Sequence, residues 1–559
     1  MRRSKLVLSA VLGLLLSACN ETPPPGSGGG GGAPPPSGGP GGAYVLTAWN
    51  DLGMHCMDSD YGVFAILPPY NNLHAQLLLK SQGLVASGVR VEYAARTGLD
   101  GGINTTSQGK TNFWDHVEAL FGVRLPPDVG LKGKPTPSTA PAPLDPDPTA
   151  GEWRAEGIPL TPYNDDGRRN FYPLVRVTAR DAATGEVLAQ VDAVLPVSDE
   201  MDCRMCHGSN ARRDDAKPKG GWVHDPNPER DYRLNILRLH DERHPGAVKD
   251  HQSALAAAGY RYDPAGLEAT ARGGTPILCA ACHASNALPG VGIGLKPLTQ
   301  AIHGKHAGVT DPRNGLKLGA EANRTACYAC HPGATTQCLR GAMGSAKNPD
   351  GTQKIQCQDC HGGLAAVGRQ SRRGWLDEPN CQACHHDGRR ELSALDPATG
   401  GLRRVRDARF ATNPDTPLPG TSLFRLSHGH GNLACEACHG PTHAVYPAGP
   451  ADNLGVQTLQ GHAGTLAECG VCHDPVPLTA DGGPHGMHTV GEAWVRRHGD
   501  AAEKGTAGCA YCHGADHRGG PLSATWSDRS FALEHGQKHF PKGHRVGCYD
   551  CHNGPGGDD

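Results

Sequence analysis

Short runs in which apolar and polar residues alternate recur through the first third of the chain. Alternation with a period of two is typical of β-strands that bury one face, and clusters of Gly or Pro separate the runs. We therefore expect a β-sandwich-like domain over residues 43–200, with strands at Tyr44–Trp49, Gln76–Leu79, Val89–Tyr93, Leu174–Thr178 and Val187–Val191.

Two segments interrupt these strands. One short helix is expected around Asn112 to Leu120, and the Pro-rich stretch from Pro126 to Gly151 is interpreted as a surface excursion. From Ser198 onward the regular patterns give way to short helical turns and loops that contain Gly, Pro and His. The expected fold class is therefore mixed: a β-rich N-terminal domain, followed over residues 201–559 by a domain of short helices and loops.

The N-terminus has the pattern of an export signal. Met1–Lys5 is basic, and the apolar run Leu6–Leu16 is too short to span a membrane as a stable helix. The sequence Leu16-Ser17-Ala18-Cys19 resembles the lipobox of bacterial lipoproteins. That resemblance implies removal of residues 1–18 and attachment of a lipid to Cys19. The alternative is an ordinary signal peptide with an incidental Cys.

Residues 19–42 are expected to form a disordered tether behind the lipidated Cys. The stretch is almost wholly Pro, Gly and Ser, so it cannot bury apolar surface. In the lipoprotein family, Asn20 directly after the lipidated Cys implies sorting to the outer membrane. No other stretch is apolar enough to cross a bilayer, so the lipid would be the only membrane anchor.

The composition is less apolar than is usual, and the region from Cys203 to His552 is too polar for an ordinary hydrophobic core. Only 37% of the 559 residues are hydrophobic and 5% are aromatic, while 77 Gly and 46 Pro are present. The formal net charge is −3, and removing Arg2, Arg3 and Lys5 with the signal peptide makes it more negative. An acidic protein disfavours nucleic acid and could attract cationic metal species or a basic partner.

One pentapeptide, Cys-x-x-Cys-His, occurs nine times between Cys203 and His552. Both sulfurs lie on one side of a helical turn, where they can reach the two vinyl groups of one porphyrin, and the next His meets the iron. A single Cys-x-x-Cys would equally suit zinc or a disulfide, but nine copies with His predict nine covalent c-type haems. Numbered first to ninth, the motifs are Cys203/Cys206/His207, Cys279/Cys282/His283, Cys327/Cys330/His331, Cys357/Cys360/His361, Cys381/Cys384/His385, Cys435/Cys438/His439, Cys469/Cys472/His473, Cys509/Cys512/His513 and Cys548/Cys551/His552.

An iron that only passes electrons needs a sixth ligand. Besides the nine motif His, 18 others follow Cys203, twice the number required, whereas only Met343 and Met487 lie beyond the first motif. Bis-His coordination should therefore dominate, and the porphyrins would form the core of this domain. Helical pairing and closeness to the motifs favour ten His as distal ligands: His240, His244, His303, His306, His428, His430, His443, His462, His488 and His498.

These features resemble the multihaem c-type cytochromes of the bacterial cell envelope, especially the outer-membrane lipoprotein cytochromes of metal-respiring bacteria. The resemblance rests on the nine motifs, the lipobox and stretches such as Cys435–His443, and covers the C-terminal two-thirds at the level of motif. It implies closely stacked haems that conduct electrons between redox partners at either end. Trp49–Met57 also looks similar to segments of such cytochromes, with no role attached to it.

Two cysteines, Cys56 and Cys338, belong neither to a motif nor to the lipobox. In an oxidising compartment they most simply form a disulfide that joins the N-terminal domain to the haem domain. The alternative is a soft-ligand metal site, suited to copper, at Met54, His55, Cys56 and Met57.

The expected function is electron transfer through nine haems, as part of extracellular or outer-membrane respiration, by a carrier rather than an enzyme. Expected partners are other redox proteins of the envelope, with metal oxides or soluble metal ions as acceptors. The protein would face the periplasm or the cell surface. One alternative is a multihaem reductase of a small oxyanion or sulfur compound, which needs a five-coordinate iron. Another is a subunit of a conducting filament or other homo-oligomer.

Overall fold

The structure is a computed structural model that describes residues 42–369 and 424–555, apart from 202, 286, 334, 427, 429–431, 467, 475–491, 508, 521–522, 524, 526–527, 534–535 and 542–543. The predicted signal peptide, the lipidation site Cys19 and the tether to residue 41 lie outside the described residues. So do the fifth motif and two predicted ligands, at Cys381, Cys384, His385, His430 and His488. A search of the described residues finds no helix long and apolar enough to cross a membrane.

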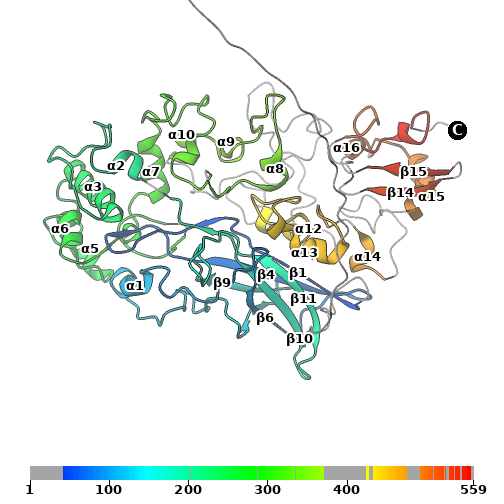
Figure 1. Cartoon of the computed structure of the whole chain (residues 1–559), viewed down its shortest axis with the longest axis horizontal. Coiled ribbons are helices and arrows are strands. Elements are labelled where there is room, and N and C mark those ends of the chain that lie inside the picture. The colour runs from blue at the N-terminus through cyan, green and yellow to red at the C-terminus, as the bar shows by residue number, and fades with distance from the viewer. Residues whose placement is uncertain are drawn as a thin grey trace, which may run out of the picture. The chain divides into compact units, whose positions relative to one another are not determined.

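Two antiparallel sheets form the first part of the described chain (Figure 1). The first sheet contains, in spatial order, β1 (Tyr44–Trp49), β4 (Asn71–Leu79), β9 (Glu152–Ile158) and β8 (Asp145–Asp147), with β5 (Gly83–Leu84) paired to β4. The second contains β11 (Val187–Val194), β10 (Leu174–Asp181), β6 (Val89–Arg96) and β7 (Ala142–Pro143).

The predicted elements of this part are confirmed. Each of the five predicted strands falls within one of β1, β4, β6, β10 and β11. The predicted helix is α1 (Phe113–Phe121), which buries Phe113, Val117 and Leu120 on one face and ends at Gly122 in the left-handed conformation. Helices and strands are mixed and none of the sheets is closed, as expected for a mixed fold.

The strands follow the alternation of the sequence. In β6, Val91 and Tyr93 are buried, and Tyr93 pairs with Val177 of β10 in the antiparallel register. On the opposite face of the same pair, the Arg180 guanidinium donates to Glu92 at 2.5 Å. Cross-strand pairs of this kind hold the register, because a slip by one residue would place the apolar side chains on the wrong face.

The prediction for Pro126–Gly151 was wrong in one respect. The segment is more than a surface excursion, since it contributes β7 and β8, which pair with β6 and β9. Ala142 and Leu144 are buried in the core. Pro lacks an N–H group but is tolerated in edge strands, so a Pro-rich composition did not prevent these short pairings.

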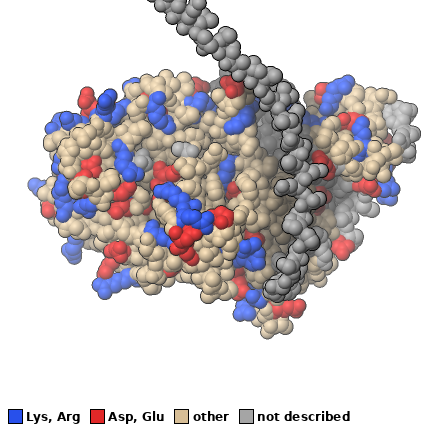
Figure 2. All heavy atoms as spheres, in the orientation of Figure 1, with Lys and Arg blue, Asp and Glu red and all other residues tan. Residues whose placement is uncertain are grey.

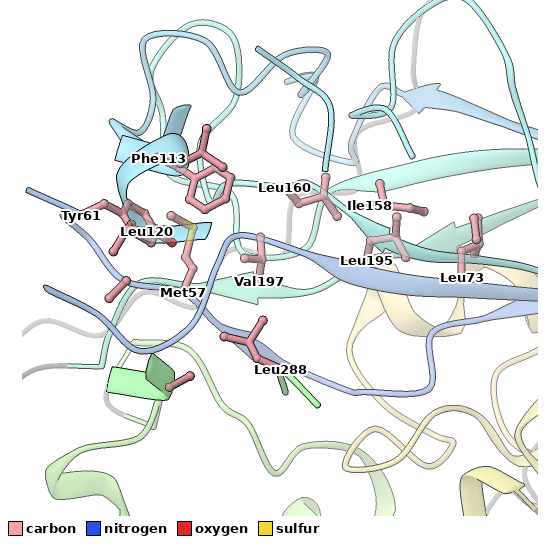
Figure 3. Packing of buried hydrophobic residues seen from close by; sticks show 14 of the residues in the cluster. Met57, Tyr61, Leu73, Phe113, Leu120, Ile158, Leu160, Leu195, Val197 and Leu288 are labelled. Carbon is pink, nitrogen blue, oxygen red and sulfur yellow. The ribbon is translucent and has the colours of Figure 1, made fainter. Parts of the chain in front are cut away.

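One hydrophobic core joins the two sheets to segments beyond residue 200 (Figure 3). The core contains Leu73 and Ile158 of the first sheet and Leu195, which directly follows β11 of the second. It also contains Leu288, from the segment that follows the second motif. Leu234 of α3 (Pro228–Arg243) belongs to the same cluster. The segments before and after residue 200, predicted as separate domains, therefore share buried apolar surface.

Two short parallel pairings lie beside this core, and the second of them joins segments on either side of residue 200. β2 (His55–Cys56) pairs with β12 (Val197–Ser198), and β3 (Phe64–Ala65) pairs with β13 (Ile277–Leu278). The residue after β13 is Cys279, the first residue of the second motif. The second motif is thus attached to the N-terminal part through backbone hydrogen bonds.

Short elements make up most of the remaining described chain, as predicted, although α3 is a regular helix of 16 residues. The others are α2 (Arg204–His207), α4 (Ala247–Asp250), α5 (Gln252–Ala257), α6 (Leu267–Arg272), η1 (Cys279–Ala281), α7 (Leu298–His306), η2 (Ala326–Ala329), α8 (Gly341–Ser345), α9 (Cys357–His361), α10 (Leu364–Val367), η4 (Phe424–Leu426), α12 (Cys435–His439), α13 (Pro450–Gln460), α14 (Cys469–Cys472), α15 (Glu492–Ala502), α16 (Ala510–His513), the hairpin β14 (Arg529–Leu533) and β15 (Gly536–Phe540), and η9 (Cys548–Asp550).

The shared core makes a prediction about stability. Leu195 is fully buried in it, so Leu195→Ala should lower the free energy of unfolding by about 2–5 kcal/mol through lost burial and an unfilled cavity. Leu99→Ala, at a side chain that is 62% exposed, should change it by less than about 0.5 kcal/mol. Urea unfolding followed by circular dichroism measures both. Equal effects of the two substitutions would contradict the shared core.

Candidate functional site

Each described motif forms one tight turn. In the first motif, the His207 N–H donates to the Cys203 carbonyl at 2.9 Å, and the same bond from the His to the first Cys closes the second, third, eighth and ninth motifs. A turn closed in this way places the two Cys and the His on neighbouring faces of a single helical turn. The local sequence is sufficient to form it, because the bond spans only four residues.

The second Cys of two motifs is exposed. Cys330 of the third motif and Cys551 of the ninth are exposed, while the other motif Cys whose side chains the structure describes are half-buried. In both motifs the 3₁₀ turn ends directly before this residue, η2 at Ala329 and η9 at Asp550. The chain leaves the turn at the second Cys, so the protein alone does not enclose these two sulfurs.

Other motif residues are placed by the structure without a test of their predicted roles. Cys360 of the fourth motif lies in α9 and is half-buried. His473 of the seventh motif follows α14 directly and is half-buried as well. Cys512 of the eighth motif lies in α16, and its side chain, like that of Cys469, lies outside the described part of the chain. Attachment of haem at these positions stays a prediction.

Four of the motif His lie opposite another His ring. The ring centres are 6.3 Å apart for His207 and His306, and 6.1 Å apart for His303 and His331. The other two pairs, with ring centres 6.0 and 5.5 Å apart, are His361 with His443 and His498 with His552.

The ring spacing suits a shared metal atom. An iron about 2 Å from one nitrogen of each ring would set the ring centres roughly 6 Å apart. The partner of the motif His in each pair is one of the predicted distal ligands: His306, His303, His443 or His498. The structure thus brings four predicted ligands to four different motifs at a distance that an iron could bridge.

Helix α7 supplies two of these partners. His303 and His306 are three residues apart on it, and each ring is held by a hydrogen bond between Nδ1 and a carbonyl in the preceding turn. The acceptors are Thr299 O and Ile302 O, both at 2.8 Å. An Nδ1–H that donates to a carbonyl leaves Nε2 as the nitrogen with a free electron pair, which is the usual arrangement of a metal-binding His.

The same backbone anchoring occurs at other candidate ligands. His283 Nδ1 lies 2.7 Å from Lys296 O, and His513 Nδ1 lies 2.7 Å from Val546 O. His498 Nδ1 is 2.8 Å from Val495 O. These contacts orient two motif rings and one distal ring in the same sense as in α7.

Burial favours the neutral form of two motif rings, His207 and His331. Burial lowers the pKa of His207 to about 4, assisted by His306, and burial lowers the pKa of His331 to about 4 beside His303. A neutral imidazole is the form that binds a metal. The buried Nδ1 of His207 has no hydrogen-bond partner among the described residues, which is unusual for a polar atom in a protein interior.

Helix α3 brings two predicted ligands to the second motif. The rings of His240 and His244 are 5.0 Å apart. Burial, with contributions from His244 and from His283 of the second motif, lowers the pKa of His240 to about 4. Its buried Nδ1 also has no hydrogen-bond partner in the described part of the chain. His240 is therefore a neighbour of both His244 and His283.

Several motifs are direct neighbours. A side-chain hydrogen bond joins Cys327 of the third motif to Cys357 of the fourth. Cys472 of the seventh motif contributes to the raised pKa of Cys438 in the sixth, after the larger effect of burial. In the same way Cys509 of the eighth motif contributes to the raised pKa of Cys548 in the ninth.

Two shared segments connect further motifs. Helix α7 faces both the first and the third motif, through His306 and His303. His443, four residues after His439 of the sixth motif, faces His361 of the fourth. The first, third, fourth, sixth and seventh motifs therefore form a continuous series of neighbours, and the eighth and ninth form a pair.

The two remaining described candidates occupy other surroundings. His462 has both ring nitrogens engaged locally, with Nδ1 2.9 Å from Ala463 O and Nε2 3.2 Å from Glu468. A ring bonded on both sides is poorly placed to bind iron. His428 pairs through its backbone with Ala434, directly before the sixth motif.

The predicted disulfide is not formed in this structure. Cys56 and Cys338 are both free thiols. They lie near each other, because Cys338 contributes to the raised pKa of Cys56, after the larger effect of burial. Burial also raises the pKa of Cys338 to about 12. Thiols in this state react slowly, since the thiolate is the reactive form.

The alternative copper site is not assembled either. Met57 lies in the hydrophobic core beside Leu120 (Figure 3), and His55 Nε2 lies 2.8 Å from Pro68 O. More generally, the described residues contain no group of three or more His, Cys, Asp or Glu arranged to hold a metal ion. The sites considered above rest on pairs of rings instead.

The segment Trp49–Met57 lies against the motif region. A Cβ added to Gly53 would lie 2.7 Å from Thr442 O and 3.0 Å from His443 Nδ1. Asp51 lies 3.3 Å from Arg425, which precedes the sixth motif. The segment to which the sequence attached no role is therefore a contact surface for the residues around His443.

One buried group of charges at this contact was not indicated by the sequence. Five segments contribute one side chain each to this group beside the sixth motif: Asp51, His74, Glu152, Arg425 and Glu436. Only Glu436, between the two Cys of a motif, has a position that could have drawn attention to it.

Comparison with known proteins adds no assignment. No protein-family model matches the chain, and no curated protein or solved structure matches it significantly.

The contact at Gly53 can be tested by a matched pair of substitutions. Gly53 and Gly83 both have positive φ, +66° and +90°, but a Cβ at Gly83 would meet nothing within 4 Å. Both Ala variants should lose stability from the backbone conformation. Gly53→Ala should lose about 1–3 kcal/mol more, because Thr442 and His443 must move. Thermal unfolding measures the difference, and equal losses would contradict the contact.

Proposed function

We propose that this protein is an electron-transfer protein that binds nine c-type haems covalently in the bacterial cell envelope. The observation that carries the proposal is the set of four His–His ring pairs with centres 5.5–6.3 Å apart. In each pair one His belongs to a Cys-x-x-Cys-His motif. The two His of each pair come from separate segments of the chain. The same spacing in four places therefore supports a shared role in binding iron.

The side chains have distinct roles in this proposal. The two Cys of each motif form thioethers that fix the porphyrin, and the motif His binds the iron. Partners such as His303 and His306 bind the opposite side, and their carbonyl contacts keep Nε2 directed at the metal. Each haem would supply one iron that accepts and releases a single electron.

Conduction follows from the arrangement of the motifs. The contacts between Cys327 and Cys357, and between the sixth and seventh motifs, would bring porphyrin edges close together. An iron with His on both sides has no open position for a substrate. Ring pairing therefore favours a carrier over the alternative of a multihaem reductase, which needs a five-coordinate iron.

The proposed location is the outer membrane, with the lipid on Cys19 as anchor and the haem-bearing part facing the periplasm or the cell surface. The proposed partners are other redox proteins of the envelope, with metal oxides or soluble metal ions as acceptors. Basic and acidic side chains are interspersed on the face seen in Figure 2. With a net charge of −3, this distribution favours such partners over nucleic acid.

Removal of single ligands should change the spin state of single haems. His303→Ala and His306→Ala should each convert one haem of nine from low-spin to high-spin, because each leaves one iron with a single axial His. All nine haems should stay attached through their thioethers. Electron paramagnetic resonance and haem quantification on the purified holoprotein measure these effects.

The matched control is His539→Ala. His539 is an exposed ring on β15 that contacts Ser530, so its removal should leave the spectrum unchanged. A substantial high-spin signal in the unaltered protein would instead favour the reductase. A haem count below nine would contradict the central assignment.

The lipid anchor is tested by Cys19→Ser. This substitution should move the protein from the membrane fraction to the soluble fraction without changing its haem content, because one lipidated residue would provide all the membrane affinity. Fractionation and mass spectrometry of the N-terminal peptide measure the result. Retention of Cys19→Ser in the membrane fraction would rule out this anchor.

A further inference from the structure

A buried carboxylic acid lies inside the sixth motif. Glu436 follows Cys435 on α12 and is only 1% exposed. Its Oε1 accepts hydrogen bonds from the backbone N–H and the hydroxyl of Thr442, both at 2.9 Å. Its Oε2 is buried and has no hydrogen-bond partner among the described residues. A fully ionised carboxylate would be poorly solvated there.

Asp51 and His74 act electrostatically on Glu436, and Arg425 and Glu152 lie against these two. Asp51, after β1, lies 3.6 Å from His74 of β4 and 3.3 Å from Arg425 of η4. His74 also lies 3.1 Å from Glu152 of β9. The phenol of Tyr446 is a further neighbour, because Glu436 contributes to its raised pKa, after burial and other groups.

The charges in this group are compensated unevenly. Asp51, Glu152 and Glu436 would carry three negative charges. The positive charges are those of His74, Arg425 and Arg154, and Arg154 lies 3.7 Å from Glu152, away from Glu436. Asp51 contacts His74 and Arg425, and Glu152 contacts His74 and Arg154, whereas the hydrogen bonds of the Glu436 carboxylate within the described part of the chain go to Thr442 alone. Glu436 is therefore the carboxylate with the least compensation.

The pKa values of Glu436, Asp51 and His74 reflect how well each charge is compensated. Burial, together with the charge of Asp51, raises the pKa of Glu436 to about 8. Burial opposes the ionisation of Asp51, yet His74 and Arg425 hold the pKa of Asp51 at about 2. Burial alone would lower the pKa of His74, but Asp51 and Glu152 raise it to about 10. Of Asp51, His74 and Glu436, Glu436 therefore has the pKa closest to neutral pH.

We infer, on the basis of the proposed function, that Glu436 takes up one proton when the haem of the sixth motif accepts one electron. A haem held by Cys435, Cys438 and His439 would supply an iron that takes one electron from a neighbouring haem, and a proton from solvent would then bind Oε2 of Glu436 and convert the carboxylate to the acid. Each step adds one charge of opposite sign, so the net charge of the buried region does not change. The sixth site thereby couples electron transfer to proton transfer.

Reduction of the haem would favour proton binding by Glu436 for an electrostatic reason. Glu436 sits between the two Cys that would hold the porphyrin, so a negative charge added to the haem lies close to it in a region of low dielectric constant. Because proton binding accompanies reduction, the midpoint potential of this haem should depend on pH. It should fall with rising pH between two limits: the pKa of Glu436 in the oxidised protein and the higher pKa of Glu436 in the reduced protein.

Infrared difference spectroscopy of the holoprotein tests the inference directly. At a pH above about 8, where Glu436 is ionised in the oxidised protein, the reduced-minus-oxidised spectrum should contain a C=O band of a protonated carboxylic acid that shifts in D₂O and is absent from Glu436→Gln. In a redox titration at several pH values, one component of nine should respond to a tenfold change in proton concentration by at most about 59 mV. Glu436→Gln should abolish this response.

The matched control is Asp550→Asn. Asp550 occupies the ninth motif between its two Cys, but it is paired with His544 at 3.0 Å and is less buried than Glu436. Its removal should leave the band and the pH response intact. Persistence of both in Glu436→Gln would overturn the inference, while nine low-spin haems in the same sample would leave the proposed function unaffected.

A second variant keeps the test decisive if Glu436→Gln does not fold. Glu436→Asp retains the acid but changes its surroundings, so the C=O band should persist at a different frequency. A band at an unchanged frequency in Glu436→Asp would assign it to another group and overturn the inference.

Discussion

Burial of the inner faces of the two sheets in one core is the constraint on which the other contacts depend. The chain after residue 200 is rich in Gly and Pro, and it obtains much of its buried apolar contact from this core through residues such as Leu234 and Leu288. The parallel pairing of β13 with β3 anchors the second motif to the same unit. Segments with little regular structure are thereby held beside a rigid sheet.

Polar contacts then fix the loops that the core does not reach. Arg340 and Asp452 form a buried ion pair at 2.8 Å, and the Arg340 N–H donates to the His443 carbonyl. Glu200 accepts from the backbone N–H groups of Thr335 and Thr336. A buried ion pair adds little net stability, but it penalises every arrangement that leaves one charge alone. These contacts therefore specify where His443 lies more than they stabilise the fold.

The candidate site divides into a part that could be predicted and a part that could not. The motif turns and the choice of His303, His306, His443 and His498 came from spacing along the chain. Their partners did not, because His303 and His306 lie on one helix and face two different motifs. His462 had the same favourable spacing, yet both of its ring nitrogens are engaged within its own loop. Glu436 drew no attention, since its isolation depends on four other segments.

The sequence by itself determined the strands, helix α1 and the closed turn of the motifs, because alternation and hydrogen bonds over four residues are local. It also carried the expectation of haem chemistry, which depends only on residue types and their order. Only the tertiary structure decided which His faces which motif, that the two Cys outside the motifs lie near each other, and that the carboxyl group of Glu436 is buried beside other charged side chains. These features depend on contacts between residues far apart in the chain, such as His207 and His306, and local spacing holds no information about them.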